Sequence, residues 1–152
     1  MFAMLLSCTR DEPMEEVFSG CDPVDPSVCA FPFPSSYFEK DGDFDYADGA
    51  LGVNIDHVPV QGKYWNEKDG YSTNTPLLTW FDDLSTAGLP SHLDLDASMA
   101  EDATIVLINA ETGERVPLWA EIDQTADEDT ERTLIVHPAV PLEHSTHYVV
   151  GM

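Results

Sequence analysis

The chain of 152 residues is strongly acidic, with 29 Asp and Glu against 6 Lys and Arg and a formal net charge of −23. A field of that sign repels nucleic acid and anionic membrane surfaces, so both are excluded as partners held by charge. The length is that of one domain, and no stretch reaches the roughly 18 apolar residues that a membrane-spanning helix needs.

The chain starts with a short apolar run, residues 1–7, followed by Cys8. Leu-Leu-Ser-Cys resembles a bacterial lipobox, and we expect residues 1–8 to be a truncated signal with Cys8 as the lipidated residue. The alternative is a chance likeness at a frayed terminus. Residues 9–20 are expected to form an acidic tether. A lipid anchor would tether the protein without spanning the bilayer, and we therefore expect an exported protein, either an outer-membrane or cell-surface lipoprotein or a secreted one.

Residues 21–101 are predicted to form an irregular segment with some β structure that packs on a sandwich. Its start is rich in proline, which fixes φ and removes a backbone donor, and aromatic residues follow that are expected to hold it on the sandwich. Cys21 and Cys29 lie eight positions apart, which favours a local disulfide over a pair of metal thiolates, since no second Cys/His pair stands at ligand spacing.

Four aspartates, Asp41, Asp43, Asp45 and Asp48, follow at short intervals. Their spacing is similar to the start of a calcium loop, so calcium is the one cofactor that we consider. An EF-hand would need glycine at position 46 and glutamate at position 52, and neither is present. A solvated turn is the default interpretation and a looser calcium loop is the alternative.

Two shorter elements are expected before the main strand set. Residues 53–62 alternate enough to predict a short edge strand, in which Pro59 argues against a central place. Residues 76–81 are apolar, and they are predicted to form either a buried strand or one helical turn.

Residues 102–152 contain four apolar runs: 103–108, 116–122, 133–137 and 147–150. In the second run Leu118, Ala120 and Ile122 alternate with Trp119 and Glu121, which predicts a strand with one buried face. The first run is apolar on both faces and should be central. The turn at 111–114 should use Gly113 at positive φ. The strand set runs to the last residue, and we expect it to continue in a longer protein.

A tyrosine just after a loop, Tyr148, resembles the tyrosine corner of immunoglobulin-like sandwiches. The predicted fold class is therefore all-β: an Ig-like β-sandwich with an irregular, proline-rich, disulfide-pinned N-terminal segment. Trp119 is the interface candidate, because alternation places it on the face opposite the buried leucine.

No catalytic residue is predicted. Ser72 lies nearest to a Gly-x-Ser-x-Gly elbow, but the second glycine is absent. His144 and His147 lie in a predicted loop and lack the glutamate of a zinc-binding helix. A loop exposed to solvent is the better interpretation of both.

The stretches CDPVDPSVCAFPFPSSYF, NEKDGYSTNTPLLTWF, DATIVLINAETGERVPLWAEID and TLIVHPAVPLEHSTHYVV carry a resemblance over roughly residues 21–150. In this order they are similar to the N-terminal domain of the bacterial virulence-factor lipase family, with Tyr71 where that family usually has phenylalanine. The last fifty residues also resemble bacterial Ig-like domains of the surface-layer type. The resemblance implies a non-catalytic accessory domain of a lipase- or esterase-like protein, whose α/β-hydrolase domain would be its partner. The alternative is a free-standing cell-surface module that binds carbohydrate, calcium or protein.

Overall fold

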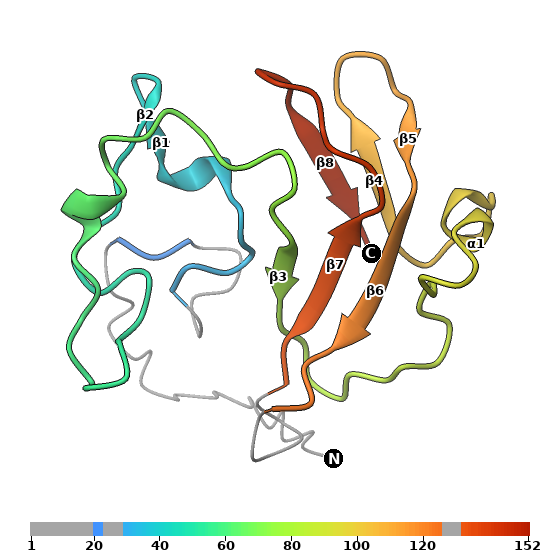
Figure 1. Cartoon of the computed structure of the whole chain (residues 1–152), viewed down its shortest axis with the longest axis horizontal. Coiled ribbons are helices and arrows are strands. Elements are labelled where there is room, and N and C mark those ends of the chain that lie inside the picture. Colours follow the sequence, from blue (N-terminus) through green and yellow to red (C-terminus); the bar gives the residue numbers. More distant parts are fainter. Residues whose placement is uncertain (1–19, 23–28, 126–131) are drawn as a thin grey trace, which may run out of the picture.

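The computed structural model describes residues 20–22, 29–125 and 132–152 (Figure 1). Cys8, and with it the predicted lipobox and nearly all of the acidic tether, lies outside these residues. Within them the chain forms two packed units, a β-sandwich and a smaller N-terminal unit of residues 29–75. No helix of the described part is long and apolar enough to cross a bilayer.

The sandwich consists of two antiparallel sheets of three strands each (Figure 1). One sheet has the order β3-β7-β6, and the other has the order β5-β4-β8. The predicted all-β class is thus confirmed, and residues 77–79 adopt the strand of the two conformations that were predicted. The strands are β3 (Leu77–Thr79), β4 (Val106–Asn109), β5 (Arg115–Val116), β6 (Leu118–Ile122), β7 (Leu134–Pro138) and β8 (Tyr148–Gly151).

The interior of the sandwich follows the period-two pattern of the sequence. On β6, Leu118 is 0% exposed and Ile122 is 7% exposed, whereas Glu121 between them is exposed. The register pairs Ala120 with Val136 across β6 and β7, so that their side chains share the inner face. Ile105 and Leu107 from the other sheet complete this core. The prediction that residues 103–108 supply a central strand is also confirmed, because β4 lies between β5 and β8.

Two local features of the sandwich agree with the sequence prediction. Gly113 has a φ of 74°, and its N–H donates to the carbonyl of Asn109 at 2.8 Å, which closes the β4–β5 hairpin. The Tyr148 hydroxyl accepts a hydrogen bond from the amide of Glu143 at 3.0 Å. A tyrosine at the start of a late strand that binds the backbone a few residues upstream is the geometry of a tyrosine corner.

A single residue, Pro117, separates the end of β5 from the start of β6, so the chain passes there from one sheet to the other. The edge of β6 is covered by the preceding loop and by the short helix α1 (Asp96–Met99). Leu118 donates its N–H to the buried Ser98 Oγ at 3.1 Å, and Ala120 donates to the carbonyl of Pro90 at 2.9 Å.

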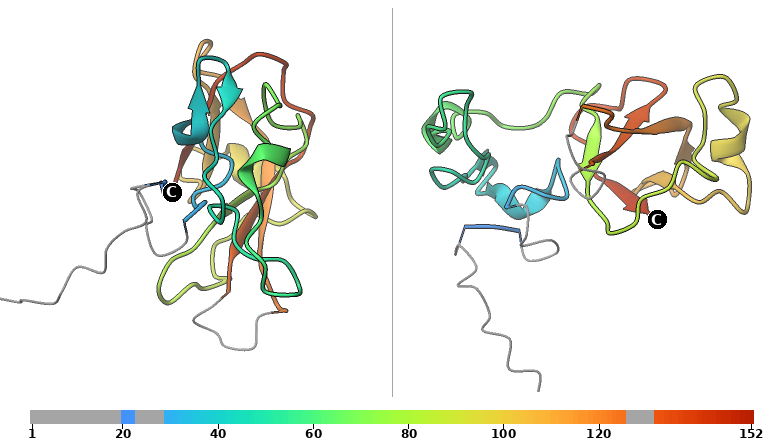
Figure 2. Two further views of the ribbon diagram at one scale, coloured as in Figure 1. Left: turned by 90° about the vertical axis from the view of Figure 1, so that its left-hand side faces the viewer. Right: turned by 90° about the horizontal axis from the view of Figure 1, so that it is seen from below.

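The N-terminal unit lies beside the sandwich (Figures 1 and 2) and has an aromatic core of its own. Phe38, Phe44, Tyr46 and Ala50 are buried together. The expectation that the aromatic residues hold this segment on the sandwich is wrong for Phe38, whose ring stacks on Tyr46 at 4.5 Å instead. Phe33 does reach the sandwich, through a bridge to Leu78. The regular elements are η1 (Ser36–Phe38), β1 (Glu39–Lys40), β2 (Asp43–Phe44) and η2 (Gly62–Tyr64).

The predicted disulfide between Cys21 and Cys29 is confirmed. The amide of Asp22 donates to the carbonyl of Cys29 at 3.0 Å, and the Ser35 hydroxyl donates to the carboxylate of Asp22 at 2.5 Å. The disulfide therefore connects the start of the described chain to Cys29, which packs against the aromatic core of the N-terminal unit.

The predicted edge strand at residues 53–62 is not formed, and only an isolated bridge joins Val53 to Pro59. The carboxamide of Asn54 accepts hydrogen bonds from the amides of Asp56 and Val58, which closes the chain into a tight turn. Side-chain bonding of this kind competes with strand pairing. The apolar residues here also lack a surface to cover, and Ile55 is 94% exposed.

Candidate functional site

The outer face of the β3-β7-β6 sheet carries a cluster of ring side chains around Trp119. The Trp119 indole stacks on the imidazole of His137 with 3.9 Å between ring centroids and 11° between planes. His92, from the loop before α1, meets the indole edge-on at 5.6 Å. Glu121 Oε1 lies 3.1 Å from His137 Nε2. We call these four residues the tryptophan patch.

The strand register produces this cluster. Trp119 and His137 are direct partners across β6 and β7, so their side chains stand next to each other on the same face. Because Leu118 and Ala120 point into the core, Trp119 must point out. The predicted position of Trp119 on the outer face is thus confirmed. The sequence does not predict His137 beside it, since the pairing of two strands cannot be read from one strand, and it does not predict His92, which comes from a loop.

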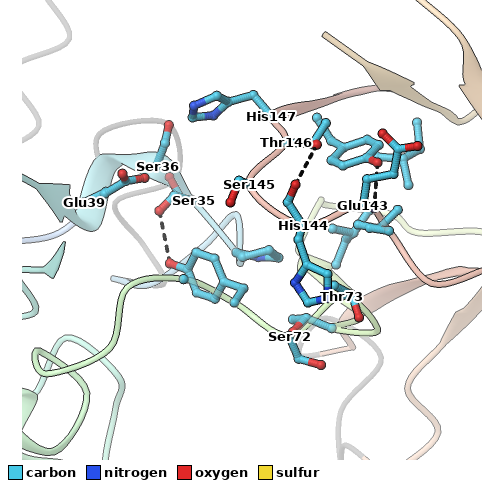
Figure 3. Close-up of a pocket in the computed structure, with 18 of the residues that line it drawn as sticks. Ser35, Ser36, Glu39, Ser72, Thr73, Glu143, His144, Ser145, Thr146 and His147 are labelled. Carbon is cyan, nitrogen blue, oxygen red and sulfur yellow. Dashed lines mark hydrogen bonds between the residues drawn. The ribbon is translucent and has the colours of Figure 1, made fainter. Parts of the chain in front are cut away.

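A cleft of about 630 Å³ lies between the N-terminal unit and the sandwich. One wall comes from residues 34–39 and 69–75, and the other comes from residues 142–150. Figure 3 shows His147 and Ser145 facing Ser35, Ser36 and Glu39 from the opposite side of the cleft. We call this feature the interunit cleft. Its lining combines hydroxyl groups and carboxylates with an apolar floor of Leu77, Leu107, Leu142 and Val150.

The cleft gathers serines, histidines and glutamates, but the contacts of Ser72 are not those of a nucleophile with its base. The Ser72 hydroxyl accepts a hydrogen bond from the amide of Asn74 at 3.3 Å, and the carbonyl of His144 accepts one from the Thr146 hydroxyl. Within residues 29–125 and 132–152 no hydrogen bond joins the Ser72 hydroxyl to an imidazole. A nucleophilic serine needs such a base within reach.

The four aspartates that were considered for calcium are used in different places. Asp45 lies 3.7 Å from the ammonium of Lys40, and Asp48 accepts a hydrogen bond from the amide of Gly62. Asp41 occupies the β1–β2 turn with a φ of 55°, and Asp43 belongs to β2. Among the residues described, no group of three or more His, Cys, Asp or Glu is placed to hold a metal ion.

The hydroxyl groups of Tyr46 and Tyr71 lie 2.6 Å apart behind the cleft wall. Tyr71 donates to the carbonyl of Ser35, so the Tyr46 hydroxyl is left to donate to Tyr71. Burial raises the pKa of both phenols, and donation to Tyr71 raises the pKa of Tyr46 further. The Tyr71 hydroxyl thus connects the cleft wall at Ser35 to Tyr46 of the aromatic core.

Comparison of the chain with family models, with curated proteins and with solved structures finds no significant match in any of the three.

Proposed function

We propose that the chain is a non-catalytic accessory domain of an exported bacterial lipoprotein, and that it braces or presents an α/β-hydrolase domain of the lipase type. The observation that carries this proposal is the tryptophan patch. Buried aromatic anchors surrounded by polar groups are the usual centre of a protein–protein contact.

The contacts within the patch suit docking. The Trp119 ring is already fixed by His137 and His92, so little side-chain entropy would be lost when a partner covers it. Glu121 at the rim, with a side chain that is 53% exposed, offers a carboxylate for a donor of the partner. A rigid ring with a polar rim is an anchor for a second domain.

The disulfide supports the export part of the proposal. Disulfides persist in oxidising compartments outside the cytosol, and the structure contains one between Cys21 and Cys29, which are eight positions apart in the sequence. An Ig-like sandwich is also a frequent architecture of cell-surface proteins. The acidic surface, with a net charge of −23, suits a protein that stays soluble between the anchor and the catalytic part.

The test starts from the native protein. An antibody against this chain should recover, from cells that express the gene, a polypeptide larger than 16.8 kDa that hydrolyses short-chain esters. In that polypeptide Trp119→Ala should lower the temperature at which hydrolysis is lost, and Glu121→Arg should do so less. The matched control Tyr64→Ala, at an aromatic residue that is 68% exposed in the N-terminal unit, should leave this temperature unchanged. Recovery of a 16.8-kDa protein without a hydrolase would contradict the proposal.

A second candidate is a free-standing cell-surface binding module, and the interunit cleft is the observation that favours it. Its volume of about 630 Å³ falls within the range of roughly 300–1,000 Å³ that ligand sites occupy. If calcium is the ligand, its addition should raise the melting temperature of the purified chain. If carbohydrate is the ligand, a glycan array should give saturable binding that Ser145→Trp, in the cleft wall, abolishes.

A further inference from the structure

The four edge strands of the two sheets differ in length and in how their outward backbone groups are hydrogen-bonded. At β3, Phe33 and Leu78 exchange backbone hydrogen bonds of 2.8 and 2.6 Å. At β6, Pro90 and Ser98 take the outward N–H groups. At β5 the edge is only two residues long. The edge of β8 is the exception, because no backbone hydrogen bond of the described chain reaches it from the side opposite β4. Natural sheets usually cover or shorten such edges.

The hydrogen-bond pattern shows which groups of β8 are open. The amide of Ala110 donates to the carbonyl of His147, and in an antiparallel pair bonded positions alternate with unbonded ones. From the register, Val149 and Gly151 therefore bond to β4. Tyr148 and Val150 turn their N–H and C=O groups away from β4. Two donors and two acceptors thus stand in a row along the open edge.

This open edge borders the interunit cleft. Tyr148 and Val150 both line the cleft, and Leu77, Leu107 and Leu142 lie on its apolar floor. The same two residues also pack against the sandwich core. A strand added beside β8 would therefore place every second side chain over the core and would extend the β5-β4-β8 sheet to four strands.

Charge decides what kind of strand fits. Glu39, Asp69 and Glu143 line the cleft. Each copy of the chain also carries a net charge of −23, so that pairing of β8 with a second copy would bring two strongly negative bodies together. A strand with basic residues meets an opposite potential at the same place.

We propose that the open edge of β8 and the interunit cleft bind one extended strand of a partner polypeptide, with apolar residues at alternate positions and basic residues between them. Main-chain hydrogen bonds to Tyr148 and Val150 hold the strand, and the leucine floor and the acidic rim select it. The site is separate from the tryptophan patch, which lies on the other sheet. Strand binding at β8 can therefore be tested independently of the hydrolase partner.

The test uses the whole chain and synthetic peptides of eight residues. The probe alternates valine and lysine. One control peptide has glutamate in place of lysine, and a second keeps every lysine but has proline at two central valine positions. We expect saturable binding of the probe by calorimetry, no binding of the glutamate peptide, and weak, unsaturable attraction of the proline peptide. Equal binding of the probe and the proline peptide would reduce the effect to charge alone and would overturn the proposal.

Two variants at one position locate the contact. Val150→Ala and Val150→Pro both remove the isopropyl group of valine, but only proline removes the N–H that faces the open edge, a change that an edge strand tolerates. We expect proline to weaken probe binding about 3- to 10-fold more than alanine does, as for one lost hydrogen bond. Equal affinities would overturn the proposal.

A third variant covers the case in which position 150 does not tolerate proline. Glu143→Lys is an exposed change at the rim and should weaken probe binding several-fold. In the native chain, bound probe should protect the amides of Tyr148 and Val150 from hydrogen exchange, and these amides should be unprotected without it. Unchanged protection of these amides would refute strand addition. A dimer in sedimentation velocity that the probe does not dissociate would show that a second copy occupies the edge, which also contradicts the proposal.

Discussion

The sandwich and the N-terminal unit pair their backbone groups and bury their apolar side chains in different ways. In the sandwich, backbone groups pair in ladders and apolar side chains alternate into one interior, as on β6. In the N-terminal unit the two strands have two residues each, and rings, side-chain hydrogen bonds and a disulfide replace the ladders. The difference shows that a proline-rich segment with many aromatic residues can build its own core next to a sheet.

The N-terminal unit depends on a few close contacts. The Asn66 side chain accepts from the amide of Tyr46 and donates to the carbonyl of the same residue, a substitute for a strand partner. Gly62 passes so close to Tyr46 that an added Cβ would lie 1.9 Å from its carbonyl oxygen. Few buried residues and many specific contacts make this unit sensitive to single changes, whereas the sandwich distributes its stability over a larger core.

The largest effect is expected in the sandwich. Leu118 is fully buried between the sheets, and Leu118→Ala should lower the free energy of unfolding by about 2–5 kcal/mol through lost burial and a cavity. Urea unfolding measures this change. Leu93→Ala, at a leucine that is 85% exposed, is the control and should change it by less than about 0.5 kcal/mol. Similar losses for both variants would mean that β6 does not form the core.

Removal of the disulfide should affect the other unit. Replacement of both Cys21 and Cys29 by serine should destabilise the N-terminal unit by about 2–3 kcal/mol, as a short closed loop predicts. Hydrogen exchange read by mass spectrometry should show faster exchange in residues 35–66 and little change in β6 and β7. Equal acceleration in both units would show that they unfold as one body.

The close approach at Gly62 predicts a smaller loss in the same unit. Gly62→Ala should destabilise it by about 1–3 kcal/mol, because the carbonyl of Tyr46 has to move away from the new methyl group. Gly70→Ala is the matched control, since an added Cβ there meets nothing within 4 Å. The loss of the Phe38–Tyr46 ring stack should be visible as changed proton shifts in NMR spectra of the first variant only.

The smallest effect concerns pH. Burial raises the pKa of Tyr46 and Tyr71 above the ordinary value of about 10, so the folded state holds these protons more tightly than the unfolded state does. Their contribution is therefore complete below pH 10 and is lost as the pH rises beyond it. Tyr46→Phe should cost about 1 kcal/mol at neutral pH and should flatten the decline of the melting temperature above pH 10. A decline of unchanged slope would exclude the tyrosine pair as its cause.

The sequence predicts the part of the fold that repeats a simple pattern. Alternation at residues 118–122 determines which side chains are buried, and Gly113 and Tyr148 mark the hairpin and the corner through their special chemistry. The N-terminal core has no long period, because its elements are short: Phe38 ends η1, Phe44 ends β2, and Tyr46 follows in a loop.

The candidate sites show the same limit. One partner of the tryptophan patch, Trp119, is predictable from its own strand, but His137 reaches it only through the pairing of β6 with β7. The interunit cleft needs both units and their placement, and no local pattern indicates it. The strand predicted at residues 53–62 fails for a related reason, since alternation there has no neighbouring strand to pair with and Asn54 closes a turn instead.

The passage of the chain through Pro117 has a consequence for the order of folding. Because one residue joins β5 to β6, the sheets meet without the closure of a long loop, and β4, β5, β6 and β7 form from consecutive stretches of sequence. Low sequence separation favours early formation, so we expect these four strands to make up the nucleus. β3 pairs with β7, which lies more than fifty residues further along the sequence, so we expect it to join in a later step.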